Sequence, residues 1–133
     1  MKNINVIKNT IGDWQVSDIA FIKAVSVLPS SDYRNLSLEI TFLSQGRKTA
    51  SSWPDTKSFF DEISIVFSEV SNLKLNFEGT SIPQIAGFDI VDVSNQGWEG
   101  INFQIEDYEN DRISFNCRDV EAKSVKPAIA LQW

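Results

Sequence analysis

The chain has 133 residues, of which 12 are basic and 18 acidic, so its formal net charge is −6; it contains no histidine and one cysteine. One domain of this length, with 42% apolar residues, can bury a packed core. The missing histidines exclude histidine–zinc sites, Ser-His-Asp triads and Cys-His dyads, because each needs an imidazole. We therefore expect a single globular domain over residues 1–133.

The start of the chain predicts a cytoplasmic protein. Polar residues interrupt every apolar run between Met1 and Lys8, whereas a secretory signal needs about 7–15 apolar residues in a row. The apolar run at residues 19–22 is far shorter than the roughly 20 residues that cross a bilayer. Cys117 has no second cysteine in the chain with which to form a disulfide.

The first strands are predicted by composition and by alternation. Residues 19–28 are rich in Ile, Val and Phe and end at a turn cluster, residues 29–32. In residues 36–42, apolar side chains alternate with polar ones, which is typical of a strand that buries one face.

Residues 52–70 allow two interpretations. Residues 52–55 resemble a helix start, with a capping serine, an acid three residues later and a proline in the first turn. The following apolar residues fit one helical face, but they also alternate in a region rich in β-branched residues. We predict a short helical turn at residues 54–60 and a strand at 62–68; the alternative is one helix over about 54–70.

The second half of the chain continues the alternation. Runs at residues 73–77, 101–105 and 113–117 read as strands, and Ile129, Leu131 and Trp133 close the series. The runs 101–105 and 113–117 flank a polar loop and predict a hairpin. We therefore predict a mainly β fold, an antiparallel sandwich or partly open barrel with at most one short helix; a helix at 54–70 would make it α+β.

The charge is uneven along the chain. Residues 86–121 contain nine acids and only two bases, Arg112 and Arg118. Proteins that bind nucleic acid usually present a basic stripe, so this segment predicts no nucleic-acid partner. An acidic surface attracts a basic protein partner and speeds the encounter; the alternative is that the acids only keep the domain soluble.

The residues that could carry chemistry favour binding over catalysis. Cys117 alternates with apolar residues and is expected in the core, and the glycines form no phosphate-binding loop, so no cofactor is predicted. Acids at 107, 109 and 111 match the start of a calcium loop, but Arg112 stands where glycine is needed and Arg118 where glutamate is needed, so no metal is predicted. An enzyme that used carboxylates alone would need a closed pocket with two convergent acids.

Part of the chain resembles a known class. Residues 62–118, in particular the strands around 66–75 and 85–92 and the acidic hairpin at 103–117, are similar to small cytoplasmic immunity proteins that accompany polymorphic bacterial toxins. This resemblance implies a non-enzymatic protein that blocks the active site or the substrate groove of a toxin. It implies no particular interface residues, because these differ with the toxin.

We therefore predict a non-enzymatic protein that binds a basic protein partner, with no membrane contact. Trp98 is expected to be an apolar anchor, because an exposed indole often dominates a protein contact. The acidic contacts are expected to be Glu99, Glu106, Asp107, Glu109 and Asp111. The alternative is a small-ligand module, for instance for carbohydrate, that stacks on Trp53 or Trp98; each tryptophan, Trp14 included, could instead belong to the core.

Overall fold

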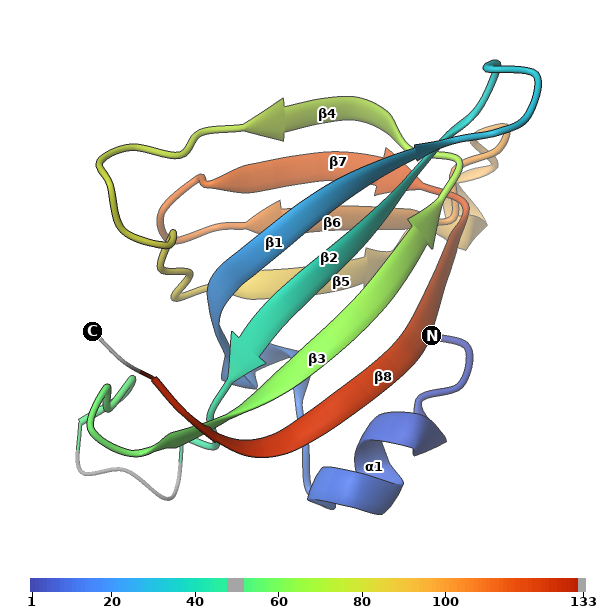
Figure 1. Ribbon diagram of the computed structural model, residues 1–133. Coiled ribbons are helices and arrows are strands. Elements are labelled where there is room, and N and C mark those ends of the chain that lie inside the picture. The colour runs from blue at the N-terminus through green and yellow to red at the C-terminus, as the bar shows by residue number, and fades with distance from the viewer. Residues whose placement is uncertain (48–51, 132–133) are drawn as a thin grey trace.

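The computed structural model describes residues 1–47 and 52–131, which form a sandwich of two antiparallel sheets (Figure 1). The long sheet has the order β1-β2-β3-β8, with strands at Ile19–Pro29, Leu36–Ser44, Phe59–Ser68 and Asp119–Ala130. The short sheet has the order β4-β7-β6-β5, with strands at Ser71–Leu75, Ile113–Cys117, Phe103–Asp107 and Phe88–Asp92. The predicted mainly β fold is confirmed, and of the two predicted architectures the structure has the sandwich.

The core lies between the two sheets and follows the alternation of apolar residues. In β3, every second residue from Ile63 to Phe67 is buried, as the period of two requires. Phe67 meets Phe115 of β7 edge-on, with ring centroids 5.0 Å apart, and Phe42 of β2 lies 4.9 Å from Phe88 of β5. Burying such rings contributes about 1.5–3 kcal/mol each, so these contacts hold the two sheets together.

The structure corrects the prediction for residues 52–70. The helical turn at 54–60 is wrong, and so is the alternative helix over 54–70, because turns and bends precede a strand that begins at Phe59. β3 pairs with β2 on one side and with β8 on the other. A central strand gains hydrogen bonds from both neighbours and buries one face, which outweighs the local helix-start signal at 52–55.

A helix lies where none was expected. Helix α1 (Asn5–Ile11) packs beside β8 (Figure 1), with Ile7 buried and Ile4 and Ile11 against the core. These three isoleucines are three and four residues apart, the spacing of one helical face. The helix ends at Gly12, whose φ of 85° favours glycine.

The segment before the helix pairs with β8 at the edge of the long sheet. The Lys2 N–H donates to the Val120 carbonyl, 2.8 Å, and the Ala122 N–H donates to the Lys2 carbonyl, 3.0 Å. β8 is longer than the predicted run at residues 129–133 and begins ten residues earlier. Trp133 lies outside the described residues.

The two ends of the short sheet carry different connections. The β6–β7 turn lies at one end, on the left in Figure 1, and the connection from β5 to β6, with the short 3-10 helix η2 (Ser94–Gln96), lies at the other. The predicted hairpin is confirmed, with its first strand shifted to begin at Phe103. No helix in the described residues is long and apolar enough to span a bilayer.

Candidate functional site

Neither the thiol nor a cluster of possible metal ligands gives a candidate centre among the described residues. Cys117 is buried in the core, as predicted, and burial, with a smaller effect from the Asp119 carboxylate, raises the pKa of its thiol to about 12. A thiol with this pKa stays protonated at neutral pH and is a poor nucleophile. Within residues 1–47 and 52–131, no three His, Cys, Asp or Glu side chains are placed to hold a metal ion.

The residues predicted to contact a partner lie at opposite ends of the short sheet. Trp98 and Glu99 precede β6, whereas Glu109 and Asp111 follow it, in the turn to β7 (Figure 1). A strand of five residues spans about 17 Å. The acidic segment is therefore divided between two ends of the molecule and does not form one acidic face.

Asp107 is a structural residue of the β6–β7 turn. It is only 2% exposed, and its Oδ1 accepts hydrogen bonds from the N–H groups of Gly87, Glu109 and Asn110 at 3.3–3.4 Å. Its Oδ2 accepts one from the Arg112 N–H at 3.2 Å. The predicted contact at Asp107 is thus corrected: a carboxylate buried beneath the turn cannot touch a partner, and it fixes the shape of the turn instead.

The turn presents an exposed tyrosine among carboxylates. Tyr108 is 65% exposed, and Glu109 and Asp111, which follow it in the turn, are exposed as well. We call the surface made by Tyr108, Glu109, Asp111 and the neighbouring Glu78 the hairpin end. Glu106, also predicted as a contact, lies half-buried in β6 just before the turn. An apolar ring beside acids combines packing area with charge for a basic partner.

Gly87 lets the hairpin end pack closely against the start of β5. Its carbonyl accepts a hydrogen bond from the Tyr108 N–H at 3.0 Å. A Cβ atom at this position would lie 2.6 Å from Cγ of Glu109 and 2.7 Å from Cε2 of Tyr108. Any side chain larger than hydrogen would therefore push both residues of the hairpin end out of place.

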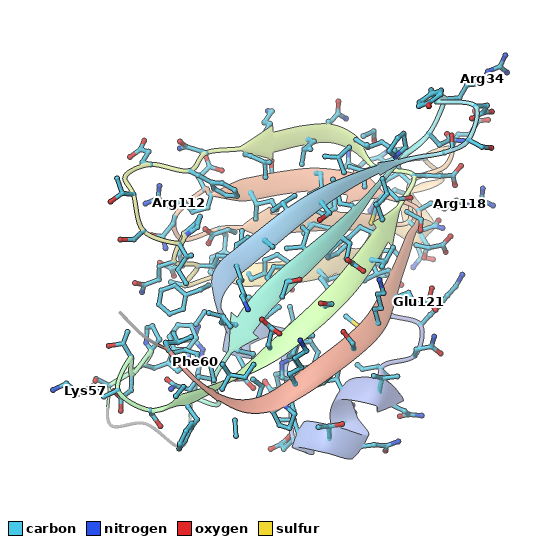
Figure 2. The ribbon with its side chains drawn as sticks, viewed as in Figure 1. Arg34, Lys57, Phe60, Arg112, Arg118 and Glu121 are labelled. Carbon is cyan, nitrogen blue, oxygen red and sulfur yellow. The ribbon has the colours of Figure 1, made fainter. Side chains whose placement is uncertain are left out.

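Arg112 is the cation nearest to the hairpin end. Figure 2 shows it between the β4–β5 connection and the β6–β7 turn, and its Nη1 lies 4.0 Å from a carboxylate oxygen of Glu78. Its Nε is buried without a hydrogen-bond partner. Among the described residues, Glu109 and Asp111 form no ion pair, so Arg112 offsets only part of the negative charge.

Ion pairs neutralise some of the acids of the long sheet. In the long sheet, Glu62 forms ion pairs with Lys23 and Lys126, and Glu39 pairs with Lys123. Asp61 and Glu121 of the same sheet form no ion pair among the described residues. At the hairpin end, the three acids Glu78, Glu109 and Asp111 face the single nearby cation Arg112, so this surface has a net charge of about −2.

The opposite end carries the exposed tryptophan. Trp98 is 47% exposed. It does not line the open groove of about 500 Å³ at this end, which is lined by the next residue in the chain, Glu99, and by the exposed Tyr33 of the β1–β2 loop. Trp14 is buried, with its Nε1 donating to the Ser44 hydroxyl at 2.9 Å. Trp53 is also covered: the Arg47 guanidinium lies 3.6 Å above its ring, so of these three tryptophans only Trp98 offers a free face.

Sequence reasoning missed Tyr108 and misassigned Asp107. Both lie in the acidic run at residues 106–111, whose acids are all predicted as surface contacts. The alternation of residues along β6 could have predicted that Asp107 is buried. Asp107 is two residues after the core residue Ile105 and so points to the same side of β6. An acid on the inner face next to a turn indicates a carboxylate that accepts backbone N–H groups.

Comparisons with protein-family models, with curated proteins and with solved structures gave no match. The resemblance to immunity proteins stays a prediction.

Proposed function

We propose that this chain is a non-enzymatic binding protein that docks a basic protein partner through its hairpin end, as an immunity-type inhibitor of a basic toxin would. The observation that carries the proposal is the buried Asp107 carboxylate, which holds the turn while Tyr108, Glu109 and Asp111 stay exposed. A surface that is already ordered loses little conformational entropy on binding.

The chemistry of this surface favours a cationic partner. Toxins that act on nucleic acid need a basic groove to hold phosphates, and an inhibitor with acidic side chains is drawn to that groove. Tyr108 supplies the rigid aromatic contact that often dominates the binding energy of an interface. The acids around it would raise the association rate and make the affinity dependent on salt.

The test compares two double variants with the same change in net charge. Glu109→Lys with Asp111→Lys reverses the hairpin end, and Glu99→Lys with Glu121→Lys reverses two exposed acids elsewhere. The wild-type chain is immobilised, a basic protein is recovered from the source organism, and its affinity for each variant is measured from 50 to 300 mM NaCl. We expect the first variant to bind at least about tenfold more weakly, with a shallower salt dependence, and the control to bind within about twofold of wild type.

Two outcomes contradict the proposal. The first is that both double variants lose the same affinity, since net charge rather than the hairpin end would then govern binding. The second is that the wild-type chain retains no basic protein at 50 mM NaCl. Circular dichroism and urea unfolding of each variant show that the comparison is between folded proteins.

Carbohydrate binding is the second candidate, and the exposed face of Trp98 favours it. Because Trp53 is covered by Arg47, this function depends on Trp98 and the groove at the same end of the sandwich. It predicts a saturable change in tryptophan fluorescence with mono- or oligosaccharides that is independent of salt and is lost in Trp98→Ala. Unchanged fluorescence at 50 mM sugar excludes it.

A further inference from the structure

A recess of about 590 Å³ opens at the surface of the sandwich, and none of the hairpin-end residues lines it. It lies between the loop that follows α1, the end of β2 and the start of β3, and Asp13, Asp18, Phe59 and Asp61 are among its lining residues. Its size is that of a typical site for a small molecule or for one long side chain of a protein partner.

The recess and the hairpin end flank the same backbone segment. Arg47, at the rim of the recess, donates from Nη2 to the Ala86 carbonyl at 2.7 Å. The next residue, Gly87, accepts the Tyr108 N–H on its other side at 3.0 Å. The hairpin end and the recess are therefore connected through Ala86 and Gly87, so a partner that extends from the hairpin end along this segment would reach Arg47 at the recess.

Asp18 contributes a carboxylate oxygen to the recess. Asp18 is only 8% exposed, and its Oδ2 accepts a hydrogen bond from the Gln15 N–H at 3.1 Å. Its Oδ1 has no hydrogen-bond donor among the described residues. This oxygen is accessible from the recess, which Asp18 lines. A carboxylate oxygen that is open to a recess can accept a hydrogen bond from an external cationic donor.

Acidic residues outnumber basic residues in the described lining of the recess. Asp61 accepts the Ala128 N–H through Oδ1 at 3.2 Å and, with Asp13, brings the carboxylates to three. The opposing cation is Arg47, which is engaged by the Ser17 and Ala86 carbonyls and by the Trp53 ring. The described lining therefore carries a net charge of about −2, which favours a cationic ligand.

Phe59 adds an aromatic wall. Its side chain is 63% exposed although it is large and apolar, and it borders the recess. A ring face attracts a guanidinium or ammonium group. We propose that the recess binds the cationic head of an arginine or lysine side chain of the protein partner, which rests on the proposed function for the identity of that partner.

The proposal is tested with the side chain alone. N-acetylarginine amide is titrated into the isotope-labelled chain at low ionic strength, and amide shifts are followed by NMR. We expect saturable shifts of residues 18, 59 and 61, with a dissociation constant in the millimolar range. N-acetylnorleucine amide, which lacks the charge, should give none, and N-acetylglutamate, an anion, should bind more weakly than the arginine probe.

Conservative variants locate the binding. Asp18→Asn and Asp61→Asn keep an oxygen for the Gln15 and Ala128 N–H groups but remove the charge, so the fold should survive. Each should weaken binding of the arginine probe about tenfold, and Phe59→Leu about threefold. Glu99→Gln, in the groove at the other end of the sandwich, is the control and should change nothing.

The inference is overturned if the arginine probe gives no saturable shifts, if it binds Asp18→Asn and Asp61→Asn as tightly as wild type, or if N-acetylglutamate binds more tightly. Its failure is distinguishable from failure of the proposed function, because this titration needs no partner. Probe binding at the recess together with a partner that ignores charge reversal at the hairpin end would contradict only the proposed function.

Discussion

The hydrogen bonds of Asp107 give a quantitative prediction about stability. Replacing Asp107 by alanine removes the acceptor of four backbone N–H groups. The N–H of Gly87 lies in a buried position, and a buried donor without a partner costs about 2 kcal/mol. The other three bonds are part-buried and longer than the usual 2.9–3.0 Å, so each contributes about 0.5 kcal/mol. The expected loss is therefore about 3–4 kcal/mol.

Urea unfolding followed by tryptophan fluorescence measures this loss. With an m value of about 2 kcal/mol/M, the unfolding midpoint of Asp107→Ala should fall by about 1.5–2 M. Asp107→Asn keeps one oxygen for the three donors that Oδ1 serves, and should lose only about 1 kcal/mol. An alanine variant within 0.5 kcal/mol of wild type would refute the structural role, as would an asparagine variant that is equally unstable.

Three further predictions concern the turn, the thiol and the core. Gly87→Ala should displace Tyr108 and Glu109 and weaken partner binding about tenfold. Its free energy of unfolding, measured in urea, should fall by only about 1–2 kcal/mol. A variant that binds the partner with full affinity would contradict the close packing of Tyr108 and Glu109 on Gly87. Cys117 should not react with a thiol reagent at pH 8 unless urea is added. Because its pKa is raised from 9 to about 12, the folded state holds this proton more tightly than the unfolded state, so stability should fall as the pH rises from about 9 to 12. Phe67→Ala should cost about 3–5 kcal/mol by calorimetry, since its ring is fully buried.

The strands were predictable where one face is buried and the other is polar. Alternation over residues 36–42 and 113–117 identifies β2 and β7, because a period of two is set by the backbone itself. The same logic failed for β8, whose outer residues are charged and whose apolar positions are few. It also failed for α1, because a helix of seven residues shows only two turns of its apolar face.

The candidate site was predictable only in part. Composition identifies an acidic hairpin, and the structure places Glu109 and Asp111 at its exposed turn. Trp98 and this turn are close in sequence. They lie at opposite ends of the short sheet, because β6 runs between them. The recess has no local signal at all, since Asp18 and Asp61 come from segments that meet only in the folded chain.

Residues 84–87 connect the hairpin end and the recess to the long sheet. The segment pairs with β1 along one side, and it accepts hydrogen bonds from Arg47 through Ala86 and from Tyr108 through Gly87. The positions of the hairpin end and of the recess are therefore set by the same backbone before any partner arrives. Binding to such a surface requires little ordering of loops, so charge complementarity and desolvation decide the affinity. The contribution of Arg47 then has two opposing parts, because its cation weakens the attraction of the recess for basic groups while its hydrogen bonds keep the segment in place.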